Sequence, residues 1–167
     1  LFHQTVQLPC LAHHHLQEVD VVELCTNVLQ QFAHNLPDRR FSLTADPQPL
    51  IVQADSLRLE QVLTNLLDNA VKYSPNGGPV VIAVTVRGDN ACIAVTDQGL
   101  GIPSAEVGRI FEAYYQAHAG NYRSGLGLGL YISNEIARLH GGEITAESVE
   151  GVGTTVTICL PLPSGQP

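Results

Sequence analysis

The sequence predicts an α+β fold in which a mixed, mainly antiparallel sheet packs on three main helices as a two-layer α/β sandwich. Three helical patterns with one apolar face are interspersed with strand patterns. Two pairs of strand patterns are separated by short turn sequences, as in β-hairpins. Helices and strands do not alternate regularly, which argues against a parallel βαβ sheet and for the sandwich.

Composition indicates one globular domain. The chain has 167 residues, 44% of them hydrophobic and 14% charged, which excludes a disordered or fibrous chain. Sixteen acidic against eight basic residues give a net charge of -8. Because the few basic residues do not cluster, neither nucleic acid nor an anionic membrane surface is an expected partner.

The sequence also indicates the cellular compartment in which the chain is expected. Its apolar runs are shorter than the roughly 18–20 residues of a membrane span, and no signal peptide precedes them. The absence of methionine predicts a fragment of a longer polypeptide, which we expect to be the cytoplasmic portion of a soluble or membrane-anchored protein. The four cysteines show no CxxC spacing, so we interpret them as small core residues in a reducing compartment. They are Cys10, Cys25, Cys92 and Cys159.

The N-terminal quarter begins without periodicity. Residues 1–17 are interpreted as a linker or the tail of a preceding dimerisation domain, residues 18–163 as the domain, and 164–167 as a C-terminal tail. Three adjacent histidines, 13–15, could bind a metal, but neighbouring side chains diverge on a regular backbone, so this is the less favoured alternative. From Val19 to Asn35 the apolar spacing predicts a helix.

The remaining elements follow from strand and turn patterns. Asp55 is the expected N-cap of a long helix that continues to about Tyr73. A short helix is expected near residues 104–110, and another helix begins at the glycine-rich 125–129 and ends at Leu139. The predicted strands are 41–45, 50–54, 80–86, 91–96, 143–147 and 154–160.

A polar stripe on the helix from Asp55 is the first candidate site. At 100° per residue, Arg58, Gln61, Asn65, Asn69 and Lys72 fall within about an 80° arc. An ordinary solvated face is the alternative. However, a mid-helix asparagine costs roughly 0.5 kcal/mol relative to alanine. Amide oxygens suit Mg²⁺, and a lysine one turn further along could contact the phosphates that share the ion.

Asp97 and the glycines that follow it form the second candidate. A buried carboxylate only accepts hydrogen bonds and would therefore favour adenine, with its exocyclic amine, over guanine. Gly99 and Gly101 allow a flat ring to approach the backbone closely. On its own, an Asp-x-Gly-x-Gly after a strand is more often a simple turn.

The third candidate is the glycine-rich segment 125–129 at a helix start. Free amides and the helix dipole attract phosphate there. A dinucleotide fingerprint would need a preceding strand and GxGxxG spacing, and a P-loop would need Gly-Lys-Ser/Thr. Neither pattern is present in the sequence.

Five motifs in this order resemble the boxes of the ATP-binding catalytic domain of sensor histidine kinases, over residues 18–162 or so. They are Asn65-Leu-Leu-Asp-Asn69-Ala-Val-Lys72-Tyr73, Asp97-Gln-Gly99-Leu-Gly101-Ile, Ile110-Phe111-Glu112, Gly125-Leu-Gly127-Leu-Gly129 and Gly151-Val-Gly153-Thr-Thr. The resemblance implies the Bergerat fold of the GHKL superfamily, with ATP between the helices and a mobile lid at residues 112–124, anchored by Phe111.

The resemblance also implies residue roles. Asn69 and Asn65 would bind Mg²⁺, and Asn65, Lys72 and Arg123 would serve catalysis, Arg123 at the γ-phosphate. ATP-binding residues would be Asn65, Asn69, Lys72, Tyr73, Asp97, Gly99, Gly101, Ile102, Tyr115, Gly125, Leu126, Gly127, Leu128, Gly129 and Thr154. We expect Asn65, Asn69 and Asp97 to open onto one cavity.

The resemblance implies phosphoryl transfer from Mg-ATP to a histidine on a separate dimerisation domain, through which the parent protein would form a homodimer. A response regulator would act downstream in the phosphorelay. No histidine here is followed by Asp or Glu, as that acceptor would be. Family members often have threonine at Leu126, glycine at Ser124 and arginine at Gln116, which leaves a degenerate nucleotide-sensing module as an alternative. A GHKL ATPase would need a glutamate base where Asn65 stands.

Overall fold

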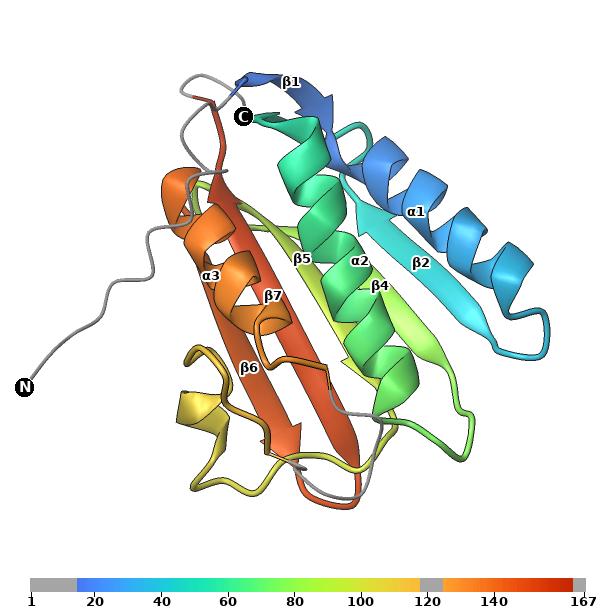
Figure 1. Cartoon of the computed structure of the whole chain (residues 1–167). Helices are drawn as coiled ribbons and strands as arrows, with labels where there is room; N and C mark the ends of the chain where they lie inside the picture. Colours follow the sequence, from blue (N-terminus) through green and yellow to red (C-terminus); the bar gives the residue numbers. More distant parts are fainter. Residues whose placement is uncertain (1–14, 118–124, 164–167) are drawn as a thin grey trace, which may run out of the picture.

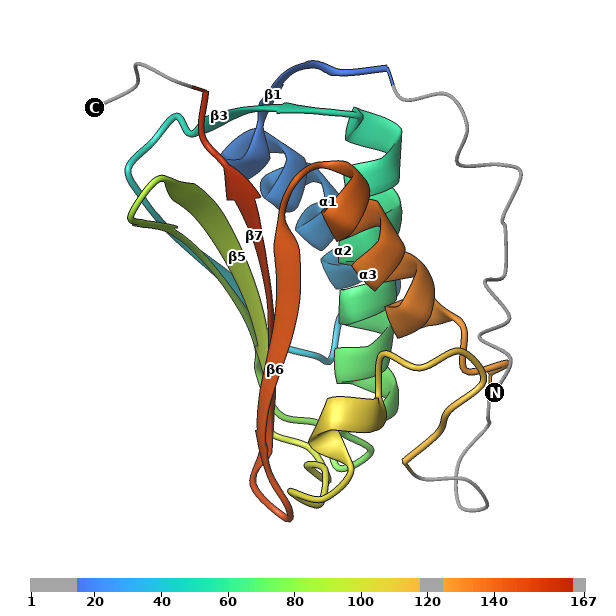
Figure 2. The same cartoon turned by 90° about the vertical axis from the view of Figure 1, so that its left-hand side faces the viewer.

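The computed structural model describes residues 15–117 and 125–163. Figures 1 and 2 show two layers, with helices on one face of a twisted sheet. Across the five-stranded sheet the order is β2-β4-β5-β7-β6; β2 pairs parallel with β4, and the other neighbours are antiparallel. The strands are β2 Phe41–Asp46, β4 Val80–Arg87, β5 Asn90–Asp97, β6 Glu143–Val149 and β7 Gly153–Pro161. The predicted mixed, mainly antiparallel sheet is therefore confirmed.

The helical layer consists of α1 Val21–Asn35, α2 Ser56–Lys72 and α3 Gly129–Leu139. Each helix turns an apolar stripe to the sheet, and alternate strand residues meet it, as the periods of helix and strand require. The central helix α2 buries six apolar residues: Leu59, Val62, Leu63, Leu66, Leu67 and Ala70. Since these side chains occupy the core, the opposite stripe of α2 is free to serve a site.

A second, two-stranded sheet was not predicted. β1, Gln17–Asp20, pairs antiparallel with β3, Ile51–Ala54. Residue 17, assigned to a linker, therefore belongs to a strand, and Val19 lies opposite Val52 rather than in a helix. Helix α1 begins two residues later because the Asp20 side chain accepts a hydrogen bond from the Val22 amide, 3.0 Å away, and caps it.

The short helix predicted near residues 104–110 is a single 3₁₀ turn, Val107–Arg109. The long helix begins as predicted, with Asp55 as the N-cap accepting from the Arg58 amide. Within residues 15–117 and 125–163 no helix is long and apolar enough to cross a membrane.

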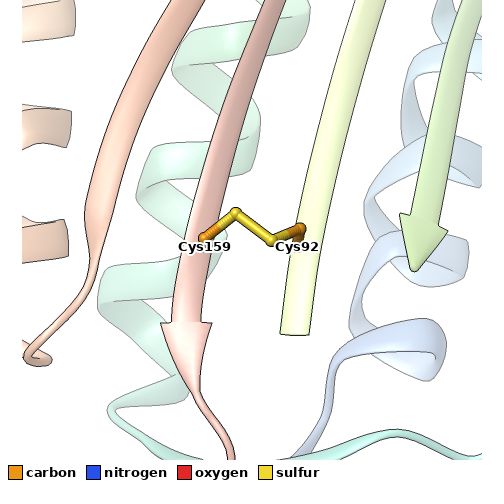
Figure 3. The surroundings of a disulfide bond; sticks show 2 residues. All are labelled: Cys92 and Cys159. Carbon is orange, nitrogen blue, oxygen red and sulfur yellow. A yellow bond between two sulfur atoms is a disulfide. The ribbon is translucent and has the colours of Figure 1, made fainter. Parts of the chain in front are cut away.

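Cys92 and Cys159, interpreted as small core residues in a reducing compartment, are bonded to each other, and the sequence did not predict this bond. A disulfide joins them across the neighbouring strands β5 and β7 (Figure 3). The two residues lie directly opposite each other in the antiparallel register, and their Cα atoms are 4.1 Å apart. Cys25 does fit the interpretation, since it is a buried free cysteine whose pKa burial raises to about 12.

Candidate functional site

A cavity of about 300 Å³ opens between the C-terminal end of α2, the ends of β5 and β7, and the segment that begins α3. This volume is at the lower end of the range for small-molecule sites. Thirteen of the predicted site residues line it: Asn69, Lys72, Tyr73, Asp97, Gly101, Ile102, Tyr115, Gly125, Leu126, Gly127, Leu128, Gly129 and Thr154. Residues from four separate motifs therefore share one cavity.

Asp97 lies at the end of β5 and is 9% exposed. Burial raises the pKa of its carboxyl, while hydrogen bonds from the backbone amides of Gly99 and Thr154 and the charge of Arg39 oppose the rise. The bond from the Gly99 amide to Oδ1 is 2.8 Å long. The carboxylate is thus fixed at the cavity wall with capacity left to accept a further hydrogen bond.

The glycines after Asp97 permit close contacts between backbone segments. A Cβ on Gly99 would lie 2.1 Å from the Tyr73 carbonyl oxygen, so this residue packs against the end of α2 and is not among the cavity lining. Gly101 has a positive φ of 64°, and its Cβ would lie 2.0 Å from the carbonyl oxygen of Val149. The two glycines therefore shape the loop, and only Gly101 reaches the cavity.

The last turn of α2 presents three polar side chains to the cavity. Asn69 and Lys72 belong to the predicted polar stripe, and Tyr73 is the C-cap of the helix. The Lys72 ammonium lies 4.8 Å from the centre of the Tyr73 ring. The C-terminal end of the stripe therefore forms part of the cavity wall, rather than a wholly solvated face.

Asn65 does not line the cavity. Its side-chain nitrogen donates to the Gly129 carbonyl oxygen at 3.3 Å and to the Ser133 hydroxyl at 3.4 Å. The Ser133 hydroxyl in turn donates to the same carbonyl. Of the three groups expected on one cavity, the structure brings Asn69 and Asp97 together and places Asn65 beside the start of α3.

The glycine-rich segment forms the turn that leads into α3. Gly127 adopts a positive φ of 69°, and its carbonyl accepts a hydrogen bond from the Tyr114 amide at 3.0 Å. Its Cβ position is closed by the backbone of residues 114–115, the nearest atom being 2.8 Å away. The turn is therefore packed against the start of the predicted lid, and Gly129 and Leu130, the first residues of α3, line the cavity.

The predicted lid is described only in part. Phe111 packs against the hydrophobic core, as expected of an anchor. The guanidinium carbon of Arg109 lies 4.3 Å from the centre of the Tyr115 ring, and the Gln116 side chain donates to the Gly125 carbonyl. Arg123 and Ser124 lie outside the described residues, as do His13 and His14. Within the described ranges, no group of three or more His, Cys, Asp or Glu could hold a metal.

The apolar residues of the lining were not predicted as site residues, although Leu66, Ala70 and Ile110 stand within the quoted motifs. These residues come from α2, the strands, the 3₁₀ turn region and the start of α3, and their apolar periodicity is the same as that of core positions. An apolar residue that lines a cavity therefore cannot be told from a core residue by its position in the pattern. They are Leu66, Ala70, Val95, Ile110, Ala117, Leu130 and Val156.

Fold and site together define an ATP-binding domain of the Bergerat type. The family model described as histidine kinase-, DNA gyrase B- and HSP90-like ATPase matches residues 54–164. Sensor histidine kinase WalK of Bacillus subtilis is 39% identical over 147 residues, which are 86% of this chain and 23% of that protein. The chain belongs to this ATPase family, and its resemblance to sensor histidine kinases is confirmed.

Solved structures agree. The mycobacterial sensor histidine kinase MprB is 32% identical, with a TM-score of 0.77 over 88% of this chain and 97% of that one. Full-length ShkA, solved with AMPPNP, is 25% identical with a TM-score of 0.81 over 93% of this chain and 33% of its own. The chain spans about a quarter of WalK and matches a histidine kinase catalytic domain.

Proposed function

We propose that the chain binds Mg-ATP and donates the γ-phosphate to a histidine on a separate dimerisation domain, as the catalytic module of a two-component sensor histidine kinase. One observation carries the proposal: Asn69, Lys72 and Asp97 line the same cavity as the glycine turn at the start of α3. A carboxylate for adenine, a cation for phosphate and an amide for the metal ion are thus at one site.

The chemistry of the donors fits a magnesium ion. An amide oxygen is a hard ligand, and Mg²⁺ is usually held by one or two protein oxygens together with substrate phosphates. Asn69 would hold the ion from the cavity wall; Asn65 stays a predicted second ligand, one turn earlier on α2. When bound, the ion would neutralise charge on the phosphates.

The other groups would orient the nucleotide. Asp97 would accept a hydrogen bond from the adenine amine, Lys72 would contact phosphate, and the α3 amides would bind phosphate oxygens through the positive end of the helix dipole. Phosphoryl transfer depends mainly on such positioning and on charge stabilisation. Arg123 stays a predicted contact of the γ-phosphate.

The acceptor would come from outside this chain. None of its seven histidines precedes an acidic residue, so the nucleophile would belong to a dimerisation domain of the parent protein, where the homodimer would also form. A response regulator would receive the phosphate next. We expect the phosphate transfer to take place in the cytoplasm, and we expect the domain to contact neither nucleic acid nor the membrane.

A second candidate is a degenerate module that only senses nucleotide. Two observations favour it: Leu126, often a threonine in the family, is 76% exposed, and Gln116 is bonded to the Gly125 carbonyl. ATP hydrolysis is disfavoured, because Asn65 offers an amide where a hydrolytic relative has a carboxylate base.

The test combines nucleotide binding with phosphate transfer. Titration calorimetry with Mg²⁺ should show binding of ATP and far weaker binding of GTP, and Asn69→Ala should weaken Mg-dependent binding. Asn27→Ala, on an exposed position of α1, is the matched control and should leave it unchanged.

With labelled ATP, the isolated chain should remain unlabelled, while the longer parent protein carrying the acceptor domain should become labelled. Binding without transfer would favour the sensing module. Strong labelling of the isolated chain would overturn the proposed external acceptor, and absence of ATP binding would overturn the proposed function itself.

A further inference from the structure

Arg39 lies outside the cavity, in the bend between α1 and β2, yet it contacts the part of α2 that carries the site. Its side chain is half-buried. One guanidinium nitrogen donates to the Val71 carbonyl at 3.1 Å, and the other donates to the Ser74 carbonyl. These acceptors are 32 and 35 residues further along the chain, so the contact joins separate elements.

The contact with Arg39 provides hydrogen-bond donors for backbone carbonyls at the end of α2. The last carbonyls of a helix have no partner within the helix and need other donors. Here the Ala70 carbonyl accepts from the Ser74 hydroxyl, and the Tyr73 carbonyl from the Leu100 amide at 2.9 Å. Arg39 donates to the Val71 carbonyl of the last turn and to the Ser74 carbonyl just beyond the helix, which also accepts from the Gly77 amide at 3.1 Å. Its positive charge complements the negative end of the helix dipole.

The turn held in this way is the turn that lines the cavity. Lys72 and Tyr73 both line the cavity. The Tyr73 carbonyl packs so closely on Gly99 that no Cβ fits between them, so a small shift of this turn would alter the loop after Asp97 as well. The position of two binding motifs therefore depends on where α2 ends.

We propose that Arg39 is a positioning residue of the nucleotide site, because its guanidinium holds in place the turn that carries Lys72 and Tyr73. The two donated bonds fix the geometry, and only a planar fork can reach both carbonyls at once. The positive charge has a second effect: it helps keep the Asp97 carboxylate ionised in its buried position. This inference rests on the proposed nucleotide site.

Two substitutions separate the geometry from the charge. Arg39→Ala removes both, and we expect the Kd for Mg-ATP to rise about tenfold, as for the loss of one or two hydrogen bonds. Arg39→Lys keeps the charge and can bond only one carbonyl, so its Kd should lie between those of Arg39→Ala and the wild type. Arg40→Ala is the matched control, because Arg40 is the neighbouring, exposed arginine. The affinity is measured by titration calorimetry on protein whose folding is verified by circular dichroism.

The pH dependence of binding is a readout that a loss of stability alone would not move. The charged and titratable groups around Asp97 are Arg39 from the bend and, along the same cavity, Lys72 and Tyr73 from α2 and Tyr115 from the lid. In Arg39→Ala the midpoint of the acid loss of ATP binding should move to higher pH, whereas Arg39→Lys should keep the wild-type midpoint. Comparing variants with the same nucleotide cancels its own ionisation.

The experiment distinguishes failure of the positioning role from failure of the proposed function. Wild-type affinity and an unchanged midpoint in Arg39→Ala would overturn the positioning role. If Arg39→Ala does not fold, Arg39→Lys carries the test, and wild-type affinity in that variant contradicts the inference. Failure of the wild-type chain to bind ATP would instead contradict the proposed function.

Discussion

Asp97 illustrates at the scale of one residue how burial serves binding at a cost in stability. Its pKa is raised by desolvation, so the folded chain holds the proton more tightly than the unfolded chain does. The ionised form therefore carries a folding penalty, which is absent below the ordinary carboxyl pKa and fully present above the raised one. Near neutral pH the chain bears this penalty, and the ionised carboxylate is the form that the proposed contact with adenine needs.

This argument predicts the pH dependence of ATP binding. As the pH falls through the raised pKa of Asp97, protonation removes the acceptor and the affinity should drop. Asp97→Asn should bind ATP roughly 30- to 100-fold more weakly at pH 7, the equivalent of a charged hydrogen bond, and should lose most of this pH dependence. Titration calorimetry between pH 8 and pH 5 measures both effects.

The same variant should unfold at a higher urea concentration than the wild type at pH 7, because the buried charge is gone. A variant that binds ATP as the wild type does, with an unchanged pH profile, would show that Asp97 does not contact the base.

At the scale of elements, the loop after β5 is positioned by the β6–β7 hairpin. The Gly151 amide donates to the Leu100 carbonyl, and the Ile102 amide donates to the Ser148 hydroxyl at 2.8 Å. Gly101 lies between these bonds with its Cβ position blocked by the Val149 carbonyl. This side of the cavity thus depends on contacts between segments far apart in the sequence, such as Ile102 and Ser148, which are 46 residues apart.

Gly101→Ala should therefore destabilise the chain by more than the roughly 1–2 kcal/mol that left-handed backbone costs a residue with a Cβ, since the loop must also move away from the hairpin. Gly88→Ala is the matched control: it has a similar positive φ of 58° with nothing within 4 Å of its Cβ, so it should show the backbone cost alone. Urea unfolding gives both values, and equal losses would refute the steric argument.

The elements were predictable where local chemistry determines them. Asp55 caps α2, and the apolar stripe of that helix has the period of its buried face, so both could be read from the sequence. β1 was missed because a four-residue strand with two exposed residues has almost no pattern of its own. Its existence depends on pairing with β3, a contact over more than 30 residues.

At the scale of the whole molecule, the sequence predicted those site residues whose polar side chains are uncommon at that place in a helix or after a strand. Asn69 stands out as an asparagine within a predicted helix and Asp97 as a carboxylate after an apolar strand. Leu66 and Val95 look like any core residue although they line the cavity. Arg39 was not predicted, because its partners are backbone carbonyls, which leave no trace in the sequence. Asn65 has the expected character, yet its amide is bonded to α3.

The disulfide between Cys92 and Cys159 is the longest-range covalent constraint that the described residues show, with a sequence separation of 67. Such a loop restricts the unfolded chain, and by the chain-entropy account its closure contributes about 4 kcal/mol to the free energy of unfolding. Cys92 lies near the start of β5, whereas Asp97 ends that strand at the cavity. The bond should therefore govern stability with little influence on the nucleotide site.

Reduction should accordingly lower the midpoint of urea unfolding, and a double Cys92→Ala, Cys159→Ala variant should unfold at the same lower midpoint with or without reductant. At 25 °C and without urea, the ATP affinity of both forms should remain within about twofold of the oxidised chain, since a destabilised but still folded domain retains its site. An unchanged unfolding midpoint after complete reduction would contradict the stabilising role. A large loss of ATP affinity in folded, reduced protein would instead mean that the spacing of the β5–β7 pair affects Asp97, because Asp97 at the end of β5 pairs with Thr154 at the start of β7 and both residues line the cavity.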